Sequence, residues 1–364
     1  MNAAYTSYLA PDFKDLFASL AEGGQQILLY GMGNGADKIM EKLEAMGLFV
    51  ADIFASDGFV RGQVFHGRRV LSYREICEKY DPAHAVVLLA FGSTRPEVLE
   101  AILAVADRFP VLVPDLPVCG GDFFDRAFFL AHQGEIEAAR ALFSDEASRT
   151  LYDRIIAARL EGTLSNMLAA VSERDPWDYL AAAGISIRRA ADFGAYNGDS
   201  ARDLLSRHAA EWVLCAEPDR RNFRKLTDWS AGLDKAVVEC HRVAVCDKVG
   251  EAAFDASGNR NAGLCTGRAG DTVPTDTPDR LLAGRAVDYI KYDIEGAEYG
   301  ALLGSAKTIA AHRPALRISL YHHSEDLFTL PLLLSRLAPH YRFYLTRCRG
   351  VPAWDIDLVA VPEK

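Results

Sequence analysis

Short apolar runs alternate with segments of helical periodicity along most of this chain, and this alternation is the feature that most restricts its fold. In the first third of the chain, helical segments separate four such runs, at residues 27–30, 48–55, 85–90 and 111–113. Strands that alternate with helices form a parallel sheet with helices packed on its faces. The first third therefore predicts a small α/β domain.

A second series begins near residue 188 and has seven apolar runs, at residues 190–193, 212–216, 237–245, 287–293, 315–320, 341–345 and 356–361. Residues 122–183, between the two series, are almost wholly helical in periodicity. The chain has 364 residues, which is enough for two cores. We expect an α/β protein with two doubly wound Rossmann-like domains, at residues 1–120 and 187–364, joined by a helical segment at residues 121–186. The C-terminal sheet should have seven strands, ending in an antiparallel hairpin.

The charge pattern argues against polyanionic partners. The net charge of −10 is spread over both halves, and no run of Lys and Arg forms a basic patch. No apolar run approaches about 18 residues, and residues 1–30 lack the basic start, apolar core and cleavage site of a signal peptide. We expect a cytoplasmic protein with no nucleic-acid partner and no membrane insertion.

The turn after the first strand of the second series has the sequence ADFGAYNGDS, residues 191–200. In open parallel sheets, ligands bind beyond the carboxyl ends of the strands. Gly194 and Gly198 frame this turn with the spacing G-x-x-x-G and follow Asp192, whereas a dinucleotide pyrophosphate is typically held by G-x-G-x-x-G. The pattern favours a ligand that has an ammonium group and no phosphate, such as S-adenosylmethionine (SAM).

The second strand of this series ends at Cys215-Ala216-Glu217-Pro218-Asp219. An acidic residue about 20 positions after the glycine turn is placed to accept hydrogen bonds from ribose hydroxyls. Glu217 fits that position. The alternative is that Glu217 is an unrelated loop carboxylate.

Two further strand ends carry polar residues. In DYIKYDIEGAE, residues 288–298, three acids crowd together at Asp293, Glu295 and Glu298. Crowded carboxylates repel one another, so they call for a ligand, a cation or a basic neighbour. Lys291 supplies part of this compensation. A solvated helix N-terminus is the alternative for the two glutamates. In RISLYHHSED, residues 317–326, either His322 or His323 is a candidate to take a proton from an acceptor hydroxyl, or else is a structural residue.

These pieces, together with VAVCDKVGEAAF (residues 243–254, expected as a hairpin) and LLGSAKTIAAHRPAL, resemble the FkbM family of SAM-dependent methyltransferases in order and spacing over about residues 187–362. The resemblance implies a class I methyltransferase fold. It further implies an enzyme that methylates a hydroxyl on a sugar, glycan precursor or secondary metabolite. It also implies SAM-binding positions along the strand ends, with residues 242–247 bordering the adenine and Asp293 beside the sulfonium and acceptor. The cofactor-binding candidates are Asp192, Gly194, Ala195, Gly198, Glu217, Asp219, Asp247 and Asp293, and the catalytic candidates are Asp293, His322 and His323.

The N-terminal domain leaves alternatives open. Gly31-x-Gly33-x-x-Ala36, with Asp57 after the second strand, formally fits a dinucleotide fingerprint. An NAD(P)- or nucleotide-sugar-binding oxidoreductase is therefore one rival, and a non-catalytic SAM-binding or assembly protein is another. The domain is otherwise a scaffold or a dimerisation surface, which leaves a homodimer open. We predict no required metal, although a divalent cation held by Asp293, Glu295 and a nearby histidine is a further alternative.

Overall fold

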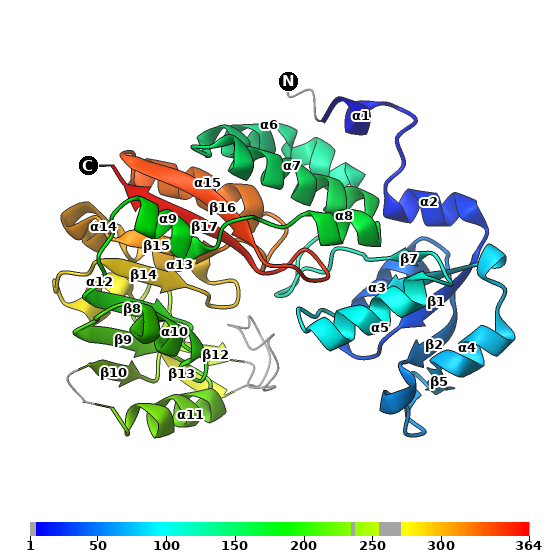
Figure 1. Cartoon of the computed structure of the whole chain (residues 1–364), viewed down its shortest axis with the longest axis horizontal. Helices are drawn as coiled ribbons and strands as arrows, with labels where there is room; N and C mark the ends of the chain where they lie inside the picture. Colours follow the sequence, from blue (N-terminus) through cyan, green and yellow to red (C-terminus); the bar gives the residue numbers. More distant parts are fainter. Residues whose placement is uncertain (1–4, 234–236, 255–270, 364) are drawn as a thin grey trace.

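The computed structural model describes residues 5–233, 237–254 and 271–363. Its N-terminal part contains a parallel sheet of order β5-β2-β1-β6-β7 (Figure 1). The strands are β1 (Gln26–Tyr30), β2 (Val50–Ala55), β5 (Leu71–Ser72), β6 (Ala85–Leu89) and β7 (Val111–Leu112). The helices are α1 (Thr6–Leu9), α2 (Leu16–Gly23), α3 (Asn34–Ala45), α4 (Tyr73–Lys79) and α5 (Pro96–Ala106), and a short ribbon pairs β3 (Val64–Phe65) with β4 (Arg68–Arg69).

The C-terminal part contains a seven-stranded sheet of order β10-β9-β8-β14-β15-β17-β16, in which β17 is antiparallel to both of its neighbours. The strands are β8 (Arg189–Phe193), β9 (Trp212–Ala216), β10 (Val238–His241), β14 (Tyr289–Tyr292), β15 (Ala315–Ser319), β16 (Tyr341–Arg347) and β17 (Ile356–Pro362). The helices are α10 (Asp199–Arg207), α11 (Arg220–Ser230), α12 (Pro278–Leu282), α13 (Glu298–Leu303), α14 (Ala306–His312) and α15 (Asp326–Leu337). The expected fold class, the seven strands and the final hairpin are confirmed.

Both faces of the C-terminal sheet are buried, which explains why its strands read as continuous apolar runs. Neighbouring residues on β8 point to opposite faces: Ala190 packs with side chains of α9, α10 and α11, and Ala191 packs with those of α13, α14 and α15. The chain leaves β8 toward β9 and β10, and later returns to the other side of β8 as β14. The order of the strands therefore reverses between β8 and β14, where an open α/β sheet forms its ligand crevice.

Four helices connect the two sheets: α6 (Arg126–Leu142), α7 (Glu146–Glu161), α8 (Leu164–Ala169) and α9 (Pro176–Ala182). In Figure 1, α6 and α7 lie above and between the two sheets. Buried residues of these two helices, among them Phe129 and Tyr152, belong to an apolar cluster that also includes Leu28 of β1 and Ile318 of β15. The helical segment therefore packs against both sheets. The exact residue boundaries of the domains stay a prediction.

Two local expectations are wrong. The apolar run 237–245 is divided, because β10 ends at His241 and β11 (Ala244–Val245) joins a separate small sheet with β12 (Gly250–Phe254) and β13 (Asp271–Asp276). The expected hairpin at residues 243–254 does not form, since β11 and β12 pair with opposite edges of β13. Among the residues described, no helix is long and apolar enough to cross a membrane.

Candidate active site

A cavity of about 440 Å³ lies at the carboxyl ends of β8, β9, β14 and β15, beside the point where the strand order reverses. This volume is within the range of small-molecule sites, about 300–1,000 Å³. Side chains and backbone from each of these strand ends line it: Gly194, Tyr196, Glu217, Asp293, Glu295 and Tyr321. The parallel strands bring these residues to one edge of the sheet although more than 120 positions separate the first from the last.

Gly194 brings the turns after β8 and β14 into direct contact. Its φ is +84°, and a Cβ atom at this position would overlap the carbonyl oxygen of Asp293. Gly198, with φ +86°, begins α10, and a Cβ there would overlap the ring of Trp229 on α11. The backbone N–H of Ala195 donates to the carbonyl oxygen of Ala216 at 3.0 Å. Gly194 therefore lines the cavity, whereas Gly198 and Ala195 hold the turn in place.

Asp192 lies beneath the cavity lining. Its carboxylate accepts a hydrogen bond from the Ser200 hydroxyl at 2.6 Å and lies 3.5 Å from the Lys291 Nζ. Burial raises the pKa of Asp192, and the charge of Lys291 opposes that rise. Ser200 and Lys291 both line the cavity. Asp192 can therefore act on a ligand through these two side chains.

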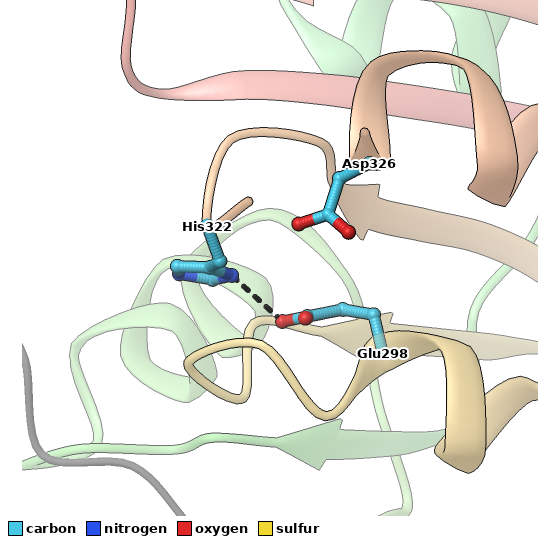
Figure 2. A group of neighbouring side chains, drawn as sticks. All are labelled: Glu298, His322 and Asp326. Carbon is cyan, nitrogen blue, oxygen red and sulfur yellow. Dashed lines mark ion pairs between the residues drawn. The ribbon is translucent and has the colours of Figure 1, made fainter. Parts of the chain in front are cut away.

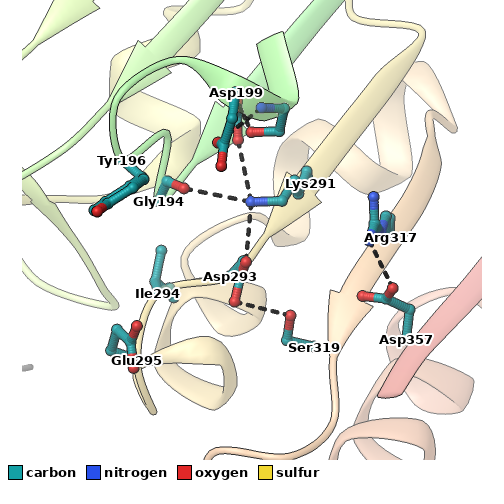
Figure 3. A network of polar contacts seen from close by, with 12 residues as sticks. Gly194, Tyr196, Asp199, Lys291, Asp293, Ile294, Glu295, Arg317, Ser319 and Asp357 are labelled. Carbon is teal, nitrogen blue, oxygen red and sulfur yellow. Dashed lines mark hydrogen bonds and ion pairs between the residues drawn. The ribbon is translucent and has the colours of Figure 1, made fainter. Parts of the chain in front are cut away.

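Lys291 is a buried cation at the centre of the acidic strand ends (Figure 3). Its Nζ lies 3.2 Å from the Asp293 carboxylate and donates to the carbonyl oxygen of Gly194 at 3.3 Å. Burial alone would lower the pKa of Lys291, but Asp293 and Asp192 outweigh it and raise that pKa. Lys291 therefore supplies part of the compensation that the crowded acids require, at Asp293, while His322 faces Glu295 and Glu298.

Glu217 is held by the backbone of its own turn. Its Oε2 accepts from the N–H of Tyr196 at 2.9 Å, and its Oε1 accepts from the N–H of Asp219 at 2.8 Å. Burial raises the pKa of Glu217 to about 7. Asp219 caps α11 by accepting from the N–H groups of Arg221 and Asn222. Glu217 lines the cavity. Asp219 shapes the turn but does not line the cavity.

Asp247 lies outside the cavity, contrary to its expected place beside the adenine. The side chain is exposed, and its carboxylate is 3.7 Å from the Lys248 Nζ. The residues that face the cavity from this stretch are the apolar Val243, Ala244 and Val245. The turn after β10 directs the chain into the small sheet before Asp247 is reached.

Asp293 is the lining acid that Lys291 and two hydroxyl donors hold. Its carboxylate is 31% exposed, lies beside Lys291, and accepts hydrogen bonds from the hydroxyls of Ser319 at 3.0 Å and Tyr321 at 3.2 Å. Burial would raise the pKa of Asp293, but Lys291 and His322 hold it well below the usual value. Asp293 is therefore suited to bind donors and cations, and a carboxylate of such low basicity is a poor proton acceptor.

His322 is not placed to act as a base. It is fully buried, does not line the cavity, and its Nδ1 lies 2.9 Å from the Glu298 Oε1. Its Nε2 lies 3.5 Å from an Asp293 oxygen and 3.6 Å from a Glu295 oxygen. Burial disfavours the charged ring, but Glu298 and the other carboxylates outweigh burial and raise the pKa of His322 to about 10. A ring that is buried outside the cavity lining, among carboxylates that favour its charged form, does not suit His322 to the expected role of proton acceptor.

His323 is also outside the cavity lining. Its Nδ1 lies 3.5 Å from the Asp326 carboxylate, and its ring packs against Gly296. The hydrogen bond to Asp326 raises the pKa of His323. The structure therefore gives this histidine contacts with Asp326 and with the turn after β14, and His323 does not line the cavity.

Among the described residues, one group of side chains has a geometry that could hold a metal ion. Glu298, His322 and Asp326 offer ligand atoms that all lie within 4.8 Å of one another (Figure 2). Asp293 and Glu295, which the sequence offered as ligands only in the alternative with a cation, are not in this group. Carboxylates face both ring nitrogens of His322. A doubly protonated ring balances their negative charge without a metal ion.

The sequence did not single out several lining residues. Among the described residues, six non-glycine residues have positive φ, and three of them line the cavity: Tyr196, Glu295 and Asp355. Strained backbone persists where surrounding structure enforces it, and it clusters at functional sites. Tyr321 and Arg317 were within a noted motif, whereas Trp354 and Asp355 come from the loop before β17, which carries no motif.

The N-terminal part also contributes to this cavity. Val118, in the segment after β7, lines it, and the Lys38 Nζ on α3 donates to the carbonyl oxygens of Pro117 and Val118. The Trp354 indole N–H donates to the carbonyl oxygen of Leu116 at 2.9 Å, and its ring packs on Gly92. The N-terminal domain thus positions one wall of the cavity.

A seven-stranded sheet of this order, with an antiparallel strand near one edge and a cavity where the order reverses, is the class I methyltransferase fold. Residues 192–349 match the family model of the methyltransferase FkbM domain. This part of the chain therefore matches the FkbM methyltransferase domain, and the resemblance seen in the sequence is confirmed.

Solved structures show how far the likeness extends. The methyltransferase FkbM from Methylobacillus flagellatus matches with a TM-score of 0.67 and 19% identity over 94% of this chain and 93% of that one. The two proteins share the fold of both domains. More distant matches are an rRNA methylase from Streptococcus thermophilus (TM-score 0.35, 12% identity, 53% of this chain and 99% of that one) and a ribosomal protein L11 methylase from Lactobacillus delbrueckii subsp. bulgaricus (0.32, 13%, 56% and 83%). No curated protein matches the sequence.

Proposed function

We propose that this methyltransferase uses SAM and transfers its methyl group to a hydroxyl of a sugar or sugar-like acceptor. The observation that carries the proposal is that Gly194, Glu217 and Asp293, which follow three different strands, all line one cavity. When bound, the cofactor supplies a methyl group on a positively charged sulfur. The residues around the cavity must then hold the two reactants in line and exclude water.

The residues present fit this cofactor. Gly194 and Ser200 both line the cavity, and the Ser200 hydroxyl is held by Asp192, so this turn could hold the amino-acid portion. Glu217 faces the cavity with a carboxylate whose orientation is fixed by two backbone N–H groups, which suits it to accept from two ribose hydroxyls. The apolar stretch Val243 to Val245 offers a surface for the adenine ring.

The far wall of the cavity supports a sugar-like acceptor. Tyr321 and Trp354 provide aromatic surface, and Asp355 provides a carboxylate beside them. Aromatic rings that combine apolar faces with polar edges suit ligands that have C–H faces and many hydroxyls. Asp293 contacts Tyr321 of this wall and Gly194 of the cofactor residues, so its carboxylate can orient the reacting hydroxyl.

Isothermal titration with SAM, S-adenosylhomocysteine (SAH) and NADH tests the cofactor. Micromolar binding of SAM and SAH that is lost in Glu217→Ala supports the proposal. Binding of NADH alone would instead support the oxidoreductase alternative at the Gly31 turn. Methyl-labelled SAM, incubated with monosaccharides and methyl glycosides, then tests the acceptor class, and label transfer only to amines or thiols would contradict O-methylation.

A further inference from the structure

We propose that Glu295 is the residue that accepts the proton from the acceptor hydroxyl, and that His322 positions it from beneath the cavity. The inference rests on the proposed function and deepens it. The sequence pointed to Glu295 only as a metal ligand or a helix-end acid, and its catalytic candidates were Asp293, His322 and His323.

The backbone aims Glu295 into the cavity. The residue follows β14 by three positions, lines the cavity, and has a side chain that is 28% exposed. Its φ is +52°, in the left-handed region that a residue with a Cβ rarely adopts. The next turn holds this conformation, because the Ile294 N–H donates to the Glu298 carboxylate at 2.8 Å. Such strain is retained where the surrounding structure over-determines it, as in sites that must present one side chain.

The groups around Glu295 leave it able to take up a proton. His322 Nε2 lies 3.6 Å from the Glu295 Oε2, and the Cys119 thiol lies 3.9 Å from the same oxygen. The other charged groups that act on it are the carboxylates of Asp293, Glu298 and Glu217. Burial raises the pKa of Glu295 to about 7, His322 opposes that rise, and the acids add to it. A base whose pKa is near the working pH is the effective kind.

The other acids nearby are less suitable. Asp293 faces Lys291 and two hydroxyl donors, which keep it charged and weakly basic. Glu217 is tied to two backbone N–H groups at the carboxyl end of β9, where the ribose is expected. His322 is buried and already protonated. Glu295 combines access to the cavity with a carboxylate that no backbone N–H among the described residues holds.

The reaction balances with Glu295 as the acceptor of the proton. The hydroxyl oxygen forms a bond to the methyl carbon as the carbon–sulfur bond breaks, and the electron pair of that bond stays on sulfur. The hydroxyl proton passes to the Glu295 carboxylate, so the positive charge of the cofactor and the negative charge of Glu295 disappear together. Release of that proton to water restores the starting state.

The activity test compares wild type, Glu295→Gln and the control Glu211→Gln, an exposed glutamate paired with Arg188. The acceptor is the methyl glycoside that wild type methylates. We expect Glu295→Gln to lower kcat by about 100-fold or more while SAH affinity changes less than threefold, since general-base catalysis is worth about 10² to 10⁴. The pH profile of wild-type kcat should have a limb near pH 7, where Glu295 loses its proton, and Glu295→Gln should lack this limb. A variant that kept kcat and this limb would overturn the proposal.

A second measurement needs no acceptor. In protein labelled with ¹³C at glutamate carboxyl carbons, the resonance missing from Glu295→Gln should titrate near pH 7 in wild type. Titration of that resonance below about pH 5 would overturn the proposal. Failure of SAM and SAH to bind wild type would reject the proposed function instead, so the two failures are distinguishable.

Discussion

Gly194, at the end of β8, packs so closely on the backbone of Asp293, at the end of β14, that a Cβ atom on the glycine would overlap the aspartate carbonyl oxygen. The contact joins the two strand ends on either side of the point where the sheet order reverses. It places the first glycine of the ADFGAYNGDS motif beside the first acid of the DIEGAE motif. A side chain at position 194 must therefore displace one of these turns.

Gly194→Ala should abolish SAH binding and lower the melting temperature. Left-handed backbone with a Cβ costs about 1–3 kcal/mol, and here the overlap with Asp293 adds to it. Gly284→Ala is the matched control, since Gly284 has a similar φ of +75° but open space around a Cβ. Titration calorimetry and thermal melts would measure both effects. Equal behaviour of the two variants would show that the contact with Asp293 has no special role.

Glu217→Gln should weaken SAH binding about 10- to 100-fold at pH 8, because hydrogen bonds to charged groups contribute about 1.5–3 kcal/mol. With its pKa raised to about 7, wild-type Glu217 gains its charge as pH rises through 7. Wild-type affinity should therefore increase from pH 6 to pH 8, while that of the variant stays level. SAH is the better probe, since it lacks the sulfonium charge to which Glu295 would also respond. A pH-independent wild type would argue against ribose binding by a buried carboxylate.

His322→Gln should destabilise the fold by about 3–5 kcal/mol, since it leaves the buried Glu298 without its charged partner. The folded-state pKa of about 10 lies above the ordinary 6.5, so the stability that His322 contributes is fully present below pH 6.5 and is lost as pH rises toward 10. Urea denaturation of wild type and variant should therefore differ most near pH 6. The exposed His340 provides a control, His340→Gln, and a difference that grew with pH would contradict a buried imidazolium.

Trp354→Leu should raise the KM for the acceptor about tenfold and leave the SAH affinity unchanged. The leucine keeps apolar contact with Gly92 but removes the aromatic wall and the hydrogen bond to Leu116. Trp177→Leu, which alters an indole outside the cavity lining, is the control. A change in SAH affinity of the same size would place Trp354 at the cofactor rather than at the acceptor.

Chelation with EDTA should leave both turnover and the melting temperature unchanged, since protonated His322 already compensates Glu298. The measurement is made before and after dialysis, with metal analysis of the purified protein. Loss of stability that Zn²⁺ or Mn²⁺ restored would instead make Glu298, His322 and Asp326 a metal site.

Much of the fold and part of the site follow from the sequence. The apolar runs at residues 190–193 and 287–293 are strands because both of their faces are covered by helices, and this burial is visible in composition alone. Glycines and acids that follow such runs must meet at one edge of a parallel sheet. For that reason the sequence predicts that Gly194, Glu217 and Asp293 lie close together, and all three line the cavity.

The tertiary structure decided which of the neighbouring polar residues face the cavity and which are protonated. His322 and Glu295 both follow strand ends that carry polar residues. Packing nevertheless buries His322 among carboxylates and leaves Glu295 facing the cavity. Asp247 is turned away by the path of β11, and Trp354 reaches the cavity because Leu116, 238 residues earlier, anchors it. Local sequence sets strand, turn and residue type, but burial and charge are sums over contacts between distant segments, so only the folded chain determines them.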